Sequence, residues 1–263
     1  MTKNIIKICI LLSGILLSIS ASAQDKKDSA YIYQGNIGLL IGTDIGGAIP
    51  FPISNIPGTI NAYPHINPAL GASISFSLIK GWGVGVEVNY KTVAMKADAR
   101  VNNQRFNMDN ATMYFTGTAK TDMKFIMLEV PLYTKYRFDN RNFVFAGLYY
   151  SRIFSSSFVA DPVKGYSGST PDIAEIIDVS DITMDFSQYL NDWDLGALVG
   201  YERAIFDKLK LALRFSMGFK DIFKSPNNYF DYSMLHARGC ITLTYDLIST
   251  KRLFQGKKQV VRR

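Results

Sequence analysis

Seven segments of the chain alternate apolar and polar residues with a period of two, and an eighth is rich in apolar and aromatic residues. Because successive side chains of a strand point to opposite faces, each segment predicts a β-strand. The clearest is 209–220, in which leucine and phenylalanine alternate with Lys210, Arg214 and small residues. A tilted strand needs about 9–11 residues to cross a bilayer, and all eight segments reach that length. They are 35–46, 67–78, 83–96, 124–136, 143–154, 192–203, 209–220 and 234–247.

The connections between these strands alternate in length. The long ones are 47–66, 97–122, 155–191 and 223–233, and the short ones are 79–82, 137–142 and 204–208. Membrane barrels have short periplasmic turns and long extracellular loops. The rhythm therefore predicts an all-β, eight-stranded antiparallel transmembrane β-barrel with both termini on the periplasmic side. Within 155–191, Thr170-Pro171 predicts a short helix through about Val179.

The hairpin 124–154 shows how the faces divide. Ile126, Leu128 and Leu132 lie on one face of its first strand, with Glu129 and Lys135 on the other. Pro131 lacks an N–H group, so we expect a bulge or distortion there. The returning strand, 143–154, does not alternate cleanly and its faces are not assigned.

A soluble lipocalin-like barrel, apolar inside and polar outside, is the main structural alternative. The polar faces are rich in glycine and serine, which suits a narrow lumen better than a solvated exterior. Aromatic residues also gather near strand ends, as in the interfacial girdle of a membrane barrel. The predicted girdle residues are Trp82, Tyr90, Tyr136, Trp193, Tyr201, Phe219 and Tyr245.

The two ends of the chain are predicted to lie outside the barrel. Lys3, Lys7, an apolar run and the motif Ala21-Ser22-Ala23 predict a signal peptide over 1–23, followed by a barrel over 24–247. Removing that segment leaves 27 basic and 22 acidic residues, a net charge of +5. The segment 248–263 carries six of the basic residues and no acid, and reads as a basic periplasmic tail. Since the excess charge sits in one exported tail, we expect no nucleic-acid partner.

An eight-stranded barrel has an interior that side chains fill, so inward charges must pair with one another. For Glu129 the candidate partners are Arg214, Arg238 and Lys91, and for Lys135 they are Glu202 or Asp194. Two interpretations stay open: a structural plug of ion pairs, or a narrow ion-conducting path. The predicted lumen charge network is Glu87, Lys91, Glu129, Lys135, Asp194, Glu202, Lys210, Arg214 and Arg238.

Enzymatic chemistry is weakly indicated. The chain has two histidines, His65 in the first long loop and His236 on an inward face, and neither has a recognisable serine or aspartate pattern beside it. Once the signal peptide is removed, Cys240 is the remaining cysteine, so no disulfide or cysteine metal site is expected. We predict no catalytic residues, no metal and no cofactor. Calcium in the acidic loop 155–191 is a minor alternative.

The run LEVPLYTKYRF, followed by FVFAGLYYS, resembles the hairpin of the PorT-like outer-membrane β-barrel domain family. Leu128, Glu129, Val130 and Pro131 match its first strand and Gly147 its second; Asp194, Gly196 and Gly200 are also similar to that family. The resemblance implies a location in the cell outer membrane. It leaves three functions open: a structural or partner-binding barrel acting through its extracellular loops, a small pore, or an accessory part of a secretion machine. The expected partners are outer-membrane lipid and lipopolysaccharide, and proteins at the loops or the basic tail.

Overall fold

The computed structural model describes residues 31–52, 54, 58–78, 81–108, 111–170, 183–225 and 229–254. The predicted signal peptide, nearly all of the predicted helix near 170–179 and the end of the basic tail lie outside these residues. Within the described part of the chain, no helix is long and apolar enough to cross a membrane.

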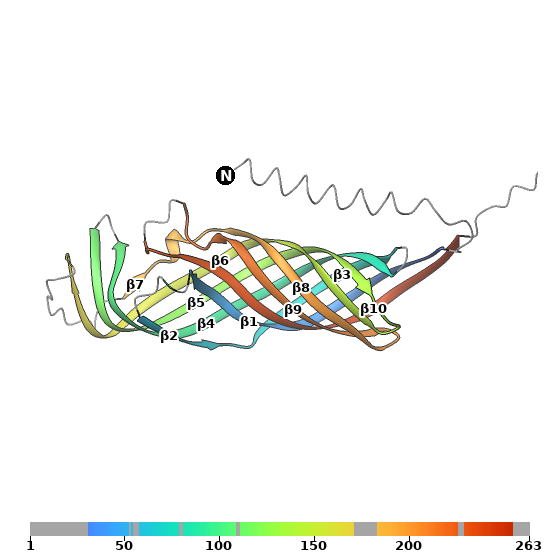
Figure 1. Ribbon diagram of the computed structural model, residues 1–263, viewed down its shortest axis with the longest axis horizontal. Helices are drawn as coiled ribbons and strands as arrows, with labels where there is room; N and C mark the ends of the chain where they lie inside the picture. The colour runs from blue at the N-terminus through green and yellow to red at the C-terminus, as the bar shows by residue number, and fades with distance from the viewer. Residues whose placement is uncertain are drawn as a thin grey trace, which may run out of the picture.

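Eight antiparallel strands close into a ring, seen from the side in Figure 1. Neighbours along the chain are neighbours in the ring, and β10 pairs with β1 to complete it. Each predicted strand lies within or largely within one of these strands, so the predicted antiparallel all-β barrel is confirmed. The eight strands are β1 (Tyr31–Phe51), β3 (Asn67–Ser77), β4 (Trp82–Met108), β5 (Ala111–Arg137), β6 (Asn142–Gly168), β8 (Trp193–Phe206), β9 (Leu209–Asp221) and β10 (Ser233–Phe254).

Two short strands bring the sheet to ten, two more than predicted. β2 (Gly58–Pro64) pairs with β4, and β7 (Met184–Asp185) pairs with β6 just before a single 3-10 turn, η3 (Ser187–Tyr189). Neither is one of the eight ring strands; each pairs with the part of a ring strand that extends away from the short turns. The short turns lie at one end of the molecule, the turn end, and the long hairpins lie at the other (Figure 1).

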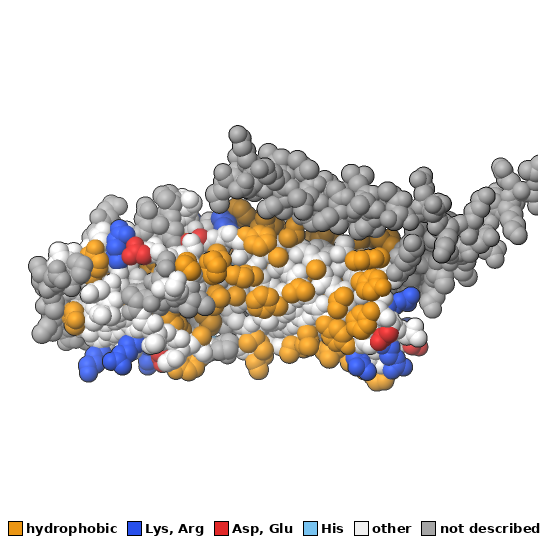
Figure 2. All heavy atoms as spheres, in the orientation of Figure 1, with side chains coloured by type: hydrophobic (Ala, Val, Ile, Leu, Met, Phe, Trp, Pro, Cys, Tyr) orange, Lys and Arg blue, Asp and Glu red, His pale blue; other side chains and the backbone are white. Residues whose placement is uncertain are grey.

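The outward face of the ring carries a continuous belt of exposed apolar side chains, which Figure 2 shows over the part of the barrel nearer the turn end. Leu132, Leu148, Val199, Leu213 and Leu243 are all exposed. A soluble barrel would bury such residues inside, so this part of the sheet is arranged for contact with lipid.

Beyond the belt the pattern reverses. On β4, Val93, Met95 and Ala97 are buried inside, while Lys96 and Arg100 are exposed. On β5, Phe125, Met123 and Ala119 are inside, while Lys124, Asp122 and Lys120 are outside. We call this region, residues 95–108, 111–125 and 155–168 with β2 and β7, the outer collar.

The outer collar corrects the prediction that 97–122 and the start of 155–191 are loops. β4 and β5 form one long hairpin whose ladder runs to Met108–Ala111, and β6 continues to Gly168. The strands extend past the lipid belt because alternation continues there with its polarity inverted, apolar inside and charged outside. The alternation typical of membrane barrels, polar inside and apolar outside, therefore does not predict strand in the collar.

Two further local features concern the ladders. The distortion expected at Pro131 is present as a gap rather than a bulge: the β4–β5 ladder omits two residue pairs there and resumes at Asn89–Glu129 in the same register. β10 also runs on to Phe254 and pairs with β1 to its first residue, Tyr31, so 248–254 is strand rather than tail. A bulge at Ile37/Gly38 leaves Leu247 without a partner and shifts the alternation, which hides the continuation in the sequence.

Candidate functional site

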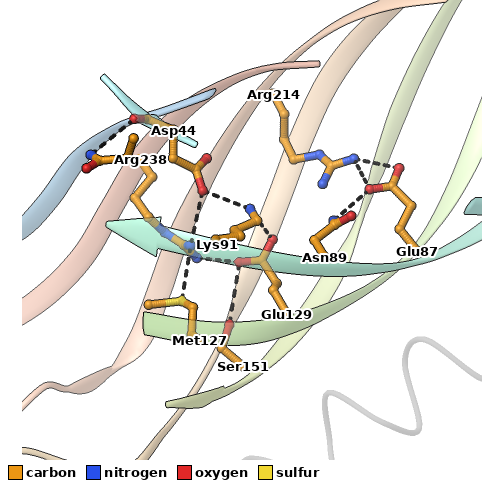
Figure 3. A network of polar contacts seen from close by, with 10 residues as sticks. Asp44, Glu87, Asn89, Lys91, Met127, Glu129, Ser151, Arg214 and Arg238 are labelled. Atoms are coloured by element: carbon orange, nitrogen blue, oxygen red, sulfur yellow. Dashed lines mark hydrogen bonds and ion pairs between the residues drawn. The ribbon is translucent and has the colours of Figure 1, made fainter. Parts of the chain in front are cut away.

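The centre of the lumen holds four fully buried charges (Figure 3). Glu129 on β5 lies with one carboxylate oxygen 2.7 Å from Lys91 Nζ on β4 and the other 2.6 Å from Arg238 Nη2 on β10. Lys91 Nζ is also 3.0 Å from Asp44 Oδ2 on β1. None of the four side chains is more than 1% exposed. Two acids and two bases balance, which is the condition under which buried charges are tolerated.

A second cluster lies next to the first, toward the turn end. Arg214 Nη2 on β9 donates to both carboxylate oxygens of Glu87 on β4, at 2.7 Å each. Asn89 Nδ2 and the hydroxyl of Tyr133 also donate to that carboxylate, each at 2.9 Å. Glu87 therefore accepts from three side chains, and the Arg214 guanidinium compensates its charge.

The two clusters contain contacts that span the barrel. In the ring, β10 and β5 are four strands apart in either direction, and so are β9 and β4. Arg238–Glu129 and Arg214–Glu87 therefore join opposite walls. The guanidinium groups also lie over aromatic rings, Arg238 over Tyr149 at 5.1 Å and Arg214 over Phe145 at 5.5 Å. These two cross-lumen ion pairs fill the lumen along its diameter.

Three of the aromatic rings fill space left by glycine. A Cβ atom added to Gly85 would lie 2.6 Å from the Tyr133 ring, one on Gly196 2.5 Å from Tyr149, and one on Gly200 2.3 Å from Phe145. Glycines on β4 and β8 thus make room for aromatic rings of the neighbouring strands, and these rings pack against the arginines.

Nearer the turn end, the remaining charges pair locally. Lys135 Nζ lies 3.1 Å from Glu202 Oε1, and Lys210 Nζ lies 2.6 Å from Asp246 Oδ2. At the level of the first cluster, Tyr149 donates its hydroxyl to Asp194 at 2.7 Å. The structure thus places all nine residues of the predicted charge network inside the barrel, each at most 9% exposed. It pairs Glu129 with Lys91 and Arg238, while Arg214 pairs with Glu87.

Some members of these clusters are not in the predicted set. Asp44 lies on the polar face of a glycine-rich segment, and that facing is the signal that would have included it. Tyr133, Tyr149 and Phe145 were not predicted because aromatic residues also line the lipid side. The structure resolves the faces of 143–154: Phe145, Tyr149 and Ile153 are buried, while Val144, Leu148 and Tyr150 are exposed.

The expectation of a polar lumen is wrong for the half of the barrel away from the turn end. There the interior is a cluster of phenylalanine and methionine, including Phe106, Phe125, Met123 and Phe186. His236 lies at the boundary, fully buried, with its ring 4.8 Å from that of Phe125 in an edge-on contact. His65 is exposed between β2 and β3. Among the described residues, no group of three or more metal-ligating side chains is brought together.

The predicted girdle residues lie at two levels of the belt. Trp82, Tyr136, Tyr201 and Tyr245 lie toward the turn end, with the rings of Trp82 and Tyr136 5.0 Å apart. Tyr90, Trp193 and Phe219 lie toward the collar, and Lys220 Nζ sits 3.6 Å from the centre of the Trp193 ring. Aromatic residues of this kind are typical of the two borders of a bilayer.

Comparison with known proteins identifies the family. The model of the outer membrane protein beta-barrel domain matches residues 22–224, so the chain belongs to this family. It is an outer-membrane β-barrel protein of the Gram-negative type, and its location is the cell outer membrane. The short turns at the turn end accordingly face the periplasm, and the outer collar projects from the cell. No curated protein is similar enough to the chain to count as a relative.

Several solved outer-membrane barrels are similar in structure at low sequence identity. Ail, the attachment invasion locus protein of Yersinia pestis, solved with the heparin analogue sucrose octasulfate, is 9% identical with a TM-score of 0.38; the match covers 82% of this chain and 99% of that one. Neisserial surface protein A is 9% identical with a TM-score of 0.35, over 84% and 100%. OprG from Pseudomonas aeruginosa is 12% identical with a TM-score of 0.29, over 86% and 97%.

Proposed function

We propose that the protein is a non-enzymatic, non-conducting barrel that binds a partner through its outer collar. The observation that carries the first half is the pair of cross-lumen ion pairs, Arg238–Glu129 and Arg214–Glu87. Both block the lumen along its diameter, and the apolar cluster above them offers no polar path for a hydrated ion. The pore remains the alternative function.

Conductance in planar bilayers tests this half of the proposal. The purified wild-type barrel is expected to give no channel events. In a variant with both arginines shortened, Arg214→Ala with Arg238→Ala, the two cross-lumen contacts are lost and the apolar cluster above them is the remaining barrier, so openings that appear only in this variant would assign the block to the ion pairs. Discrete, reproducible openings of the wild-type protein would support the pore instead.

The outer collar supports the second part of the proposal, the binding of a partner. Its strands are continuous and lie beyond the apolar belt. Its outward face carries charges of both signs, with a few exposed apolar residues such as Tyr63 and Val163 among them. Two ion pairs hold this face, Lys96–Asp122 at 3.3 Å and Arg105–Asp231 at 2.8 Å. An ordered, charged wall outside the membrane suits contact with lipopolysaccharide headgroups or with a protein.

Photo-cross-linking in cells tests the collar. A photoreactive residue placed at Lys120, which is exposed on the collar, is expected to capture a specific protein or lipopolysaccharide. The same residue at Leu132, which is exposed in the apolar belt, is the matched control and should capture membrane lipid. Phospholipid adducts alone at both positions would argue against a collar partner.

The accessory secretion role is a second candidate, favoured by the other end of the molecule. There β1 and β10 continue as a two-stranded ribbon beyond the last pairing of β3, between Gln34 and Ser77, and this ribbon includes Lys251 and Arg252. It projects from the turn end in Figure 1. A basic periplasmic ribbon suits an acidic protein partner or anionic headgroups. Cross-linking with mass spectrometry on the wild type and on Lys251→Ala with Arg252→Ala tests the ribbon; identical partners in the two proteins would argue against this role.

A further inference from the structure

The outer collar encloses an apolar cavity of about 120 Å³ that takes no part in the ion-pair clusters or in the proposed collar surface. It is lined by residues of seven strands, β1, β2, β4, β5, β6, β7 and β10, together with Phe186 and two residues that precede β10. Apolar cavities of similar size, roughly 150 Å³, stay dry and accept a benzene-sized molecule. The cavity is therefore large enough for one aromatic ring.

The lining favours an aromatic occupant. Phe106, Phe115 and Phe158 contribute ring surfaces, and Met95 and Met123 contribute thioethers. Sulfur–aromatic and aromatic–aromatic contacts each stabilise a ring beyond the burial of its surface. Methionine side chains also adapt their shape to a bound molecule, so the cavity can close around a ring without rearrangement of the strands.

One polar atom in this lining is unpaired. Gln104 lines the cavity and is 7% exposed; its amide nitrogen donates to the Arg105 carbonyl oxygen at 2.7 Å. Its amide oxygen, Oε1, is buried and accepts no hydrogen bond from the described residues. A buried acceptor left without a donor is costly, and a ligand that carries an O–H or N–H group removes that cost.

The wall beside the cavity has an unpaired edge. β2 pairs with β4, and among the described strands no ladder joins its other edge to β1. Ile49 and Pro50 of β1 and Ile60 and Ala62 of β2 all line the cavity, so it lies beneath this edge. The edge is above the apolar belt and provides a route for a small molecule from the collar side.

From these observations we infer that the outer collar binds a small single-ring aromatic molecule with one hydrogen-bond donor, the phenol class. The ring packs among Phe106, Phe115 and Met95, and the hydroxyl donates to Gln104 Oε1. This ligand satisfies both features of the cavity, its apolar shape and its single unpaired acceptor. An aromatic hydrocarbon satisfies the first feature and leaves Gln104 Oε1 unpaired.

Fluorine NMR of 4-fluorophenol and fluorobenzene tests the assignment, with the full chain in lipid nanodiscs and empty nanodiscs as the reference for lipid partitioning. The wild type is expected to bind 4-fluorophenol more tightly than fluorobenzene by about fivefold to tenfold, the ratio that one neutral hydrogen bond provides. Gln104→Met, which keeps the size and removes the acceptor, should lower that ratio to about one while both probes still bind.

Two further variants separate the site from non-specific uptake. Ala97→Phe fills the cavity and should abolish binding of both probes, whereas Lys96→Ala, one residue away on the outward face, should change neither. Equal binding of the two probes by the wild type, or a preference that survives in Gln104→Met, overturns the role of Gln104. Unchanged binding in Ala97→Phe, or no protein-specific binding by the wild type, overturns the site.

Discussion

Arg238 and Glu129 are 109 residues apart in sequence and come from opposite walls of the barrel, yet their side chains meet at 2.6 Å without exposure to solvent. The contact is possible because an eight-stranded barrel is narrow enough for an arginine and a glutamate to reach across it. It joins two strands, β5 and β10, that no backbone ladder connects directly.

Removing Glu129 is expected to be strongly destabilising. Glu129→Ala leaves Lys91 and Arg238 buried with Asp44 as their shared partner, and an uncompensated buried charge typically costs about 3–5 kcal/mol. Urea unfolding in lipid vesicles, followed by the loss of the compact band on unheated gels, measures the change. Asp122→Ala is the matched control, because its partner Lys96 is more than half exposed and such a pair contributes less than about 1 kcal/mol. Equal losses in the two variants would contradict the central role of Glu129.

Glu87 and Arg214 should be energetically coupled. Glu87→Leu or Arg214→Met alone leaves a buried charge unpaired, while the double variant removes both charges. The double variant is therefore expected to be more stable than the sum of the single losses predicts, with a coupling energy of about 1–3 kcal/mol. A double-mutant cycle by the same unfolding assay measures it. Strict additivity would show that the two side chains do not depend on each other.

Gly200 should not tolerate a larger residue. A Cβ atom there would lie 2.3 Å from the Phe145 ring and 2.5 Å from the Leu213 carbonyl oxygen, so Gly200→Ala must displace the ring that supports Arg214. Overpacking of this kind typically costs about 1–3 kcal/mol. Gly239→Ala is the control, since the nearest atom to its added Cβ is 3.9 Å away. Refolding yield and unfolding midpoint compare the two; equal values would refute the packing argument.

The turn between β5 and β6 should depend on pH. The Asp139 carboxylate accepts hydrogen bonds from the backbone N–H groups of Arg141 and Asn142, both at 2.7 Å, and from the Asn142 side chain. These bonds, led by that from the Arg141 backbone, hold the pKa of Asp139 below its ordinary value. A lowered folded-state pKa means that the stabilisation is present above the ordinary aspartate pKa and is lost as pH falls through the folded value.

Carbon-detected NMR titration of the Asp139 carboxyl measures this pKa directly. The expected midpoint lies below that of aspartate in an unfolded peptide, and the turn amides of Arg141 and Asn142 should shift with the same midpoint. In Asp139→Asn, which keeps an acceptor oxygen but no titrating group, the two amides should show no such transition. A midpoint at or above the ordinary value would contradict the hydrogen bonding seen here.

The ring of eight strands follows from alternation and loop length because both are local properties of the sequence. The inward facing of Glu129, Lys91 and Arg238 is equally local, since a period of two assigns each residue to a face. Which inward acid meets which inward base depends on the stagger of opposite strands, which alternation does not reveal. The pairing of Glu87 with Arg214 across the ring is a property of the closed barrel.

The facing of strand 143–154 and the extension of the strands into the collar could not be predicted from the sequence, for chemical reasons. Phe145 and Leu148 are both apolar although one faces the lumen and the other lipid, so the strand 143–154 shows no polarity contrast. Where β4 enters the collar, Val93, Met95 and Ala97 alternate with Ala94, Lys96 and Asp98, which is a regular strand pattern of opposite sign. A pattern with polar residues inside and apolar residues outside predicts strand only up to the point where the two faces exchange polarity.

The sign change on β4 and β5 also sets how deep the protein sits. Sliding the barrel toward the periplasm would carry Lys96, Arg100 and Lys124 from water into hydrocarbon, and each cation costs about 2–4 kcal/mol at the centre of the bilayer. Sliding it outward would first carry the apolar residues next to the collar, such as Ile126 and Leu128, from lipid into water. The β4–β5 hairpin therefore fixes the position of the barrel along the membrane normal, and with it the height of the collar above the lipid.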